Sequence, residues 1–232
     1  MFGKIFDSNE FLLLQVNDSL FPIGGYCHSF GLETYIDKGL VTTGKEVREY
    51  LERYFETDCL YTDLLGIRLA FEAAKRNSIE EIWRLEELLI CAKTAREPRS
   101  ALLKMGSRFL KTVAKMEVPF RDSFFSEYAQ AGRPPVHITA YGVFCASLGV
   151  EEIKVLSHYL YAKASAMVTV CVKTIPLSQT QGQQILSWCC GEFPGLLQRV
   201  EKLGEMDFCR SSPGLEIRCM QHEGLYSRLY MS

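Results

Sequence analysis

The sequence predicts an all-α protein, and three kinds of pattern carry that prediction. Apolar residues recur with a helical period over several long segments, capping boxes precede some of these segments, and proline or glycine ends others. Val168, Val170 and Val172 alternate as in a strand, but no other segment of comparable strength offers a pairing strand. We therefore predict one helical-bundle domain of about ten helices over residues 1–205, followed by a connector and a C-terminal tail over 206–232.

In the first half of the chain, capping boxes mark the helix starts. Thr43 with Glu46 and Ser78 with Glu81 each place a hydroxyl three residues before a carboxylate, in front of a segment with apolar residues on one helical face. A segment between them is apolar and rich in alanine, with Gly66 as its only breaker, which predicts a more buried helix. The helices predicted in this half cover residues 45–55, 61–76, 78–93 and 99–116, with a short one around Phe124 and Tyr128.

In the second half, glycine and proline mark the helix ends. Residues 132–135, Gly-Arg-Pro-Pro, predict a loop, and the helix of small apolar residues after it ends at Gly149. The longest periodic segment follows and cannot continue past Pro176. Ser178 with Gln181 forms a third capping box. The helices predicted in this half cover residues 136–148, 153–175 and 178–188.

The end of the chain differs from the bundle. Residues 206–214 are polar and contain proline and glycine, which predicts a connector. Beyond it, Leu225 with Leu229 and Tyr226 with Tyr230 are i, i+4 pairs, as on a short amphipathic helix. Such a helix buries little area by itself, so it orders on a partner or docks on its own domain, and the spacing leaves both possibilities open.

Composition excludes several classes of protein. The chain has 232 residues, is 47% hydrophobic and 23% charged, and carries a formal net charge of −2, which argues against disorder and against a nucleic-acid binder. It has no run of about 18 apolar residues, and its N-terminus does not resemble a signal peptide, so we expect a cytoplasmic protein with no membrane partner. Nine cysteines without a CxxC motif indicate reduced thiols, with a vicinal disulfide between Cys189 and Cys190 as the alternative.

Catalytic and metal-binding motifs are incomplete in this chain. It contains no GxxxxGK[ST] loop, so we expect no nucleotide hydrolysis by the chain alone. The segment around Ser29 approaches the G-x-S-x-G nucleophile motif, but Cys27 occupies the place of the first glycine; a helical thiol or serine hydrolase therefore stays as an alternative. Cys219 and His222 supply half of a metal-ligand spacing and are the metal candidates.

One loop near the N-terminus carries paired glycines, Gly24 and Gly25, between an expected helix and another that opens near Gly31. Glycine frees the backbone, so this loop is either a tight turn or a place where a partner approaches closely. In the second case Tyr26 would be an exposed aromatic anchor.

Four ordered blocks resemble the UreF family of urease accessory proteins. Residues 22–33, PIGGYCHSFGLE, are similar to the family's P-x-G-G-[FY]-x-x-S-x-G-L-E block. Residues 132–142 resemble its central segment, residues 175–183 its P-L-[GS]-Q-x-x-G-Q segment, and residues 213–230 its C-terminal signature. The stretch 56–124 matches no block.

The resemblance implies a non-catalytic scaffold. Members of this family form helical homodimers that bind UreD, called UreH in some systems, recruit the GTPase UreG and promote nickel insertion into apo-urease. The resemblance implies no cofactor, although Ni²⁺ could pass transiently by Cys219 or His222; a free-standing nickel chaperone is the alternative. The residues expected to bind UreD or UreH are Ile217, His222, Glu223, Leu225, Tyr226, Arg228, Leu229 and Tyr230. Those expected to bind UreG are Pro22, Gly24, Gly25, Tyr26, Ser29 and Glu33, the last two also being able to cap the next helix.

Overall fold

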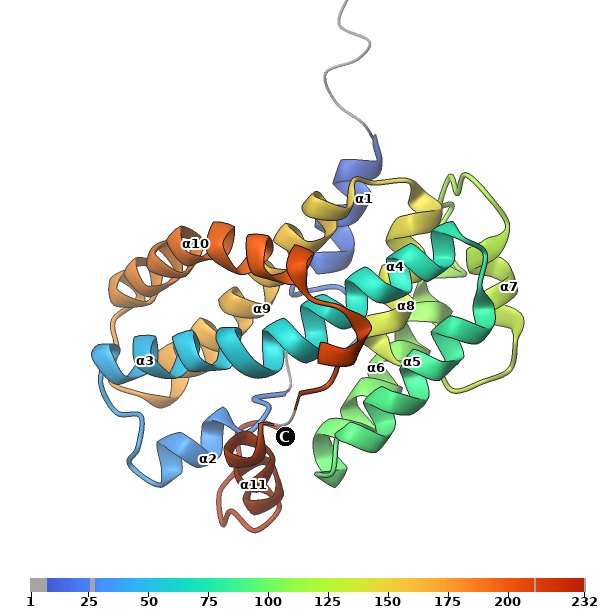
Figure 1. Cartoon of the computed structure of the whole chain (residues 1–232). Helices are drawn as coiled ribbons and strands as arrows, with labels where there is room; N and C mark the ends of the chain where they lie inside the picture. The colour runs from blue at the N-terminus through green and yellow to red at the C-terminus, as the bar shows by residue number, and fades with distance from the viewer. Residues whose placement is uncertain (1–7, 26–27, 211, 232) are drawn as a thin grey trace, which may run out of the picture.

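A computed structural model of the chain describes residues 8–25, 28–210 and 212–231, and every regular element in these ranges is a helix (Figure 1). The all-α prediction is confirmed, with eleven α-helices in the described ranges. The first half contains α1 (Ser8–Asn17), α2 (Leu32–Asp37), α3 (Gly44–Tyr54), the π-helical segment η2 (Phe55–Leu64), α4 (Leu65–Lys75), α5 (Ile79–Ala92) and α6 (Arg96–Val113). The second half contains α7 (Phe124–Gln130), α8 (His137–Leu148), α9 (Glu152–Thr174), α10 (Gln179–Lys202), the 3-10 turn η3 (Glu205–Asp207) and α11 (Pro213–His222).

Helix α8 forms the centre of the core. Every residue of α8 except Ala146 is buried, and the helix packs against α4 and α6. At Gly142 the backbones of α8 and α4 approach so closely that a Cβ would lie 2.6 Å from the carbonyl oxygen of Ile67. The small apolar residues of this segment therefore allow close helix packing, as their composition predicts, and Gly149 ends the helix in a left-handed conformation.

Helix α3, segment η2 and helix α4 form one continuous helical run, whereas the sequence predicted two helices separated at residues 56–60. Segment η2 has wider π-helical turns, and it buries the carboxylates of Asp58 and Asp63. These residues face buried lysines, so they do not interrupt the helix as exposed polar residues would. The predicted break is wrong because long-range ion pairs, not local pattern, satisfy these side chains.

Two details of the capping and length predictions are also wrong. The boxes at Thr43 and Ser178 are confirmed, but the Ser78 side chain makes no capping hydrogen bond, and the Glu81 carboxylate that would complete the box pairs with Arg76 at 2.5 Å. Helix α10 extends to Lys202, well past its predicted end at residue 188. Its buried face continues beyond that point, so packing sustains the helix there.

The apolar helix α9 is long enough to cross a membrane by length and composition, but half of its most apolar window is buried inside the fold. This burial is what a core helix of a helical bundle shows. Among the described cysteines all thiols are free. In the adjacent pair Cys189 is buried and Cys190 is exposed, so of these two only Cys189 is the buried thiol that was predicted.

A buried histidine in α8 should make stability depend on pH. Burial, assisted by Lys163, lowers the pKa of His137 to about 4. Between pH 6.5 and about 4 this histidine is protonated in the unfolded chain but neutral in the folded chain. The free energy of unfolding should therefore fall as the pH is lowered from 6.5 towards 4, by about 3 kcal/mol for this group. Replacing His137 with phenylalanine keeps a ring against Phe109 and should flatten that decline in urea unfolding series.

His28 and His158 also have lowered pKa values, mainly through burial, so part of the acid sensitivity should persist in this variant. An unchanged pH profile in the His137→Phe protein would show that His137 is protonated without opening the core.

Candidate functional site

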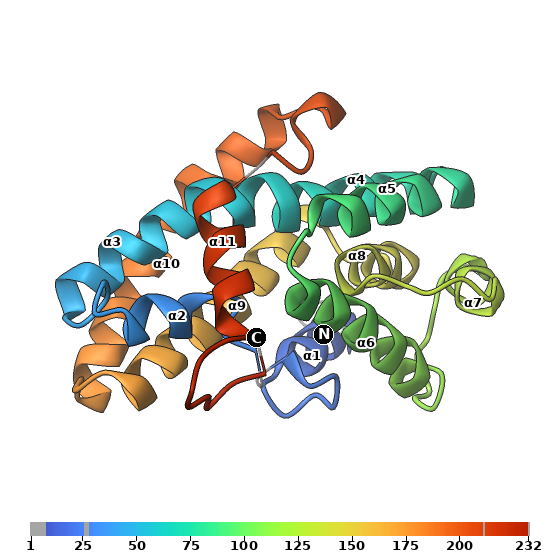
Figure 2. The same ribbon diagram turned by 90° about the horizontal axis from the view of Figure 1, so that it is seen from below.

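Helix α11 packs against the domain and lies next to α2 (Figures 1 and 2). Pro213 occupies its first turn, and Cys219 and His222 are buried. Of the two possibilities that the sequence left open for the tail, docking on its own domain is the one seen in the isolated chain. The residues after α11 are not helical, which contradicts the amphipathic helix predicted from the leucine and tyrosine pairs.

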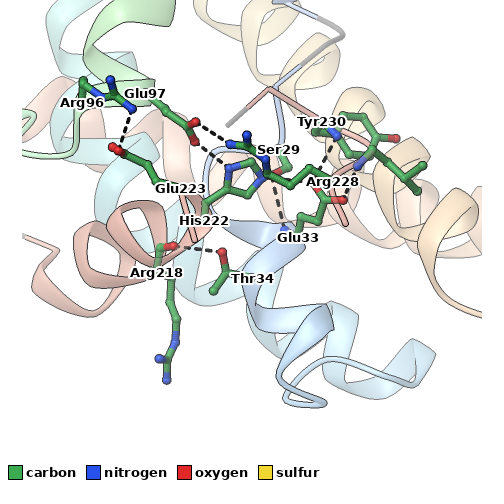
Figure 3. A network of polar contacts seen from close by, with 11 residues as sticks. Ser29, Glu33, Thr34, Arg96, Glu97, Arg218, His222, Glu223, Arg228 and Tyr230 are labelled. Atoms are coloured by element: carbon green, nitrogen blue, oxygen red, sulfur yellow. Dashed lines mark hydrogen bonds and ion pairs between the residues drawn. The ribbon is translucent and has the colours of Figure 1, made fainter. Parts of the chain in front are cut away.

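The centre of this docking is His222, which lies between two carboxylates (Figure 3). Its Nδ1 is 2.6 Å from Glu97 Oε2 and its Nε2 is 3.0 Å from Glu33 Oε2, while the ring is fully buried. A carboxylate accepts hydrogen bonds, so both bonds form together when the ring carries both protons. Arg228 donates to the other oxygen of Glu97 at 2.8 Å, so Glu97 joins the His222 ring to the Arg228 guanidinium.

The same carboxylate of Glu33 explains why the tail is not helical beyond α11. Its oxygens accept hydrogen bonds from the backbone amides of Leu229, at 2.7 Å, and Tyr230, at 3.1 Å. An amide that bonds to Glu33 is not available to a helical carbonyl. Glu33 therefore joins the start of α2 to two points of the tail, and we call Glu33, Glu97, His222 and Arg228 the tail-docking cluster.

The glycine loop touches α11 directly at Gly31. This residue has a φ of 87°, and a Cβ added to it would lie 2.9 Å from the Cys219 sulfur. Both the backbone conformation and the close approach require glycine. Ser29 is buried, and its hydroxyl accepts a hydrogen bond from the Glu33 amide at 3.4 Å, consistent with a helix-capping role.

A second set of charges connects α11 to η2 and to the segment before α6. The Lys93 ammonium lies 2.6 Å from Asp58 and 3.7 Å from Glu216 of α11, and all three side chains are largely buried. Burial alone would lower the pKa of Lys93, but the neighbouring carboxylates raise it above its usual value. Glu216 also accepts hydrogen bonds from the amides of Thr94 and Ala95, at the start of α6.

A small cavity of about 20 Å³ lies among these charges, with Lys163, Asp63 and Cys219 in its lining. That volume is enough for about one water molecule. Tyr54 is among the lining residues, and its buried hydroxyl has no hydrogen-bond partner among the described residues.

The two predicted metal candidates, Cys219 and His222, are both buried in the isolated chain. Burial raises the pKa of the Cys219 thiol to about 12, so it is protonated at neutral pH, whereas metal ligation needs the thiolate. Both nitrogens of His222 already contact carboxylates. In the described ranges no group of three or more His, Cys, Asp or Glu side chains is placed to hold a metal ion.

The predicted partner-binding residues of the tail divide into two sets. His222 and Tyr230 are buried, whereas Tyr226 is fully exposed and Leu229 and Ile217 are 71% and 51% exposed. The more polar members, Glu223 and Arg228, are exposed but tied to the domain: Glu223 pairs with Arg96 at 2.8 Å. Leu225 is half-buried.

The predicted residues of the glycine loop divide in the same way. Pro22 is exposed, Gly24 and Gly25 are partly exposed, and Ser29 and Glu33 are buried. Tyr26 and Cys27 lie outside the described residues. The loop and the tail, predicted as separate surfaces for two partners, are brought together by Glu33.

Sequence reasoning missed four residues of this site: Asp58, Lys93, Arg96 and Glu97. All lie within 56–124, the stretch without a recognisable block. Lys93, Arg96 and Glu97 contact the tail from positions more than 120 residues away in sequence, and Asp58 pairs with Lys93. No local pattern distinguishes them from ordinary surface charges. Their burial depends on contacts with distant segments, which the sequence pattern around them does not show.

The arrangement binds and positions; it offers no exposed nucleophile among the described residues of the cluster. Its charges hold a tail on which Tyr226, Leu229 and Ile217 remain exposed.

The chain is similar over nearly its whole length to several curated proteins. The UreF family model matches residues 41–189. The urease accessory protein UreF of Lachnoclostridium phytofermentans is 34% identical over 224 residues, covering 95% of this chain and 97% of that protein. Those of Ureaplasma urealyticum and Streptococcus salivarius are 33% and 31% identical, each over 95% of this chain and 95% and 93% of their own lengths. The chain therefore belongs to the UreF family of urease accessory proteins.

Proposed function

We propose that this chain is a scaffold of urease maturation: as a cytoplasmic homodimer it binds UreD or UreH through its tail, recruits the GTPase UreG beside the glycine loop, and so promotes nickel insertion into apo-urease. The observation that supports this most is the tail-docking cluster. Through Glu33 it holds the two family blocks, separated by nearly the whole chain, in one surface. A partner bound to one block would contact the other block or change its position.

Within the tail, we propose separate roles for the buried and exposed residues. Tyr226, Leu229 and Ile217 expose apolar surface that a partner can cover, and aromatic residues are frequent interface anchors. His222 and Tyr230 act as positioning residues, because they hold the backbone on which these anchors stand.

For UreG, we propose contact through Pro22, Gly24 and Gly25, with Tyr26 as the aromatic candidate. Ser29 and Glu33 are buried, so their part in this proposal is to hold the loop. The hydrolase alternative receives no support from Ser29, whose side chain is buried against the start of α2.

Nickel is cargo in this proposal. A free-standing chaperone would need ligands that are open in the isolated chain, but Cys219 and His222 are engaged as described. We therefore propose that the ion is transferred within the complex with partner proteins. Equilibrium dialysis of the isolated chain against Ni²⁺ tests this: stoichiometric retention that is lost on replacing His222 would favour the chaperone.

The scaffold proposal is tested by co-purification with UreD and UreG from one host. Removing the chain from residue 213 onwards would strip the buried partners of Glu33 and Lys93, so point variants are the better probe. Replacing Tyr226 and Leu229 with alanine should lower capture of UreD about ten-fold or more while leaving the unfolding midpoint unchanged, because both side chains are exposed.

Leu40→Ala is the matched control, since Leu40 is 48% exposed and lies outside the tail. Unchanged UreD capture by the Tyr226 and Leu229 double variant would contradict the assignment of the tail as the docking element.

A further inference from the structure

A surface that adjoins the glycine loop at Pro22 combines an apolar groove with positive charge that has no ion-pair partner among the described residues. The groove has a volume of about 550 Å³ and lies between α1 and the C-terminal end of α6. Figure 2 shows α1 beside α6. Phe11 and Leu14 of α1 are 60% and 51% exposed, and Leu20 in the next turn is 88% exposed. Thr112 and Met116 line the opposite side.

The groove offers little to a polar ligand. Its one acidic side chain, Asp18, accepts a hydrogen bond from the Leu20 amide at 2.7 Å and so holds its own turn. Large apolar side chains clustered at one exposed place are typical of a protein interaction site.

A row of cations borders this groove. Lys104, Arg108, Lys111 and Lys115 are exposed and spaced by four, three and four residues, which places them along one side of α6 and the turn after it, over about 16 Å. In the described part of the chain, no carboxylate lies within ion-pair distance of any of the four. Arg108 instead donates to the carbonyl of Ile23 at 3.4 Å. Like charges at this spacing repel one another and weaken the helix, so an acidic partner would relieve them.

The row and the groove lie next to each other on α6. Thr112 is rotated by about 70° around α6 from the mean direction of Lys104, Arg108 and Lys111. Thr112 and Met116 are the chain neighbours of Lys111 and Lys115, so these two cations border the groove on this side.

We propose that this surface, defined by Phe11, Leu14, Leu20 and the four cations, docks an amphipathic helix of a partner protein whose polar face is acidic. The apolar side of that helix would enter the groove, as in other helix-in-groove complexes, and its carboxylates would pair with Lys104, Arg108, Lys111 or Lys115.

Three other occupants fit less well. A second copy bound through the same face would bring two rows of like charge together. A nucleic acid would leave the apolar groove unused. A flat membrane surface would meet the cations but would not fill a groove lined from both sides.

The probe is a fluorescent 18-residue peptide with leucines on one helical face and glutamates on the other. Its binding to the full chain is followed by fluorescence anisotropy. The acidic peptide should bind, and added salt should weaken this binding. Two comparison peptides replace every glutamate by glutamine or scramble the leucines around the helix. Each should bind about ten-fold more weakly.

Two variants test both halves of the surface. The first variant combines Lys111→Glu with Lys115→Glu, and the second carries Leu20→Ser alone. Each variant should bind the acidic peptide about ten-fold more weakly. All three side chains are exposed, so the fold should be kept. Lys45→Glu is the matched control, because Lys45 is exposed on α3, and it should bind as the unchanged chain does.

Four results would overturn the proposal: no binding of the acidic peptide, equal binding of the glutamine peptide, tighter binding to phosphatidylserine vesicles than to the peptide, or a dimer in sedimentation that Leu20→Ser dissociates. The last two would assign the surface to a membrane or to a second copy.

Discussion

Replacing Lys93 with alanine is expected to lower the free energy of unfolding by about 3–5 kcal/mol. The variant leaves Asp58 buried without its ion pair and removes the cation that faces Glu216 of α11. An uncompensated buried charge is more destabilising than the loss of the pair as a whole. Urea unfolding followed by circular dichroism measures the change.

Two further variants separate the charge from the packing. Lys93→Met combined with Asp58→Leu removes both charges and should recover most of the loss, because a buried pair is often replaceable by apolar residues. Lys45→Ala, which breaks an exposed pair with Glu49, should change stability by less than about 0.5 kcal/mol. Equal losses in the single and double variants would mean that packing of the Lys93 stem, not its charge, holds this region.

The Lys93 pKa also predicts an alkaline limit. Because the pKa of Lys93 is raised in the folded chain, the folded state keeps its proton above pH 10.5, where the unfolded chain loses it. The stability from this group is therefore complete below pH 10.5 and declines as pH rises beyond it. The Lys93→Met, Asp58→Leu variant should lack this part of the decline.

Replacing Glu33 with alanine is expected to release the tail and to weaken capture of both UreD and UreG. The variant removes one carboxylate from His222 and the acceptor that Glu33 gives to the amides of Leu229 and Tyr230. Loss of these hydrogen bonds should cost about 3 kcal/mol together, borne by the tail, while the helical core should remain folded. Hydrogen exchange of residues 213–231 measures the opening, and co-purification measures the effect on the partners.

Glu33→Gln and Glu49→Ala complete this test. Glutamine keeps one oxygen acceptor and the shape of the side chain, so it should give an intermediate rise in exchange. Glu49 is 53% exposed, and its replacement should leave exchange in the tail unchanged. Loss of UreD capture with unchanged UreG capture would show that the tail and the glycine loop work independently, against the joint surface proposed above.

The helices themselves could be predicted from the sequence because their signals are local. Helical periodicity, the capping boxes at Thr43 and Ser178, and the breaks at Gly149 and Pro176 act over a few residues, and the structure has a helix start or end at each. The errors arose where distant contacts override that local pattern. Arg76 takes the carboxylate of Glu81, and packing continues α10 beyond residue 188.

The sequence by itself determined the helical class, most helix ends and the family blocks, including the glycine at position 31. Only the tertiary structure decided what those blocks do together. Glu33 and His222 are 189 residues apart, and no periodicity relates them; their contact follows from how α2, α6 and α11 pack. The same holds for Lys93, a charge whose buried partners come from η2 and α11. Local physics selects helices over a few residues, whereas pairing of buried charges depends on which helices meet.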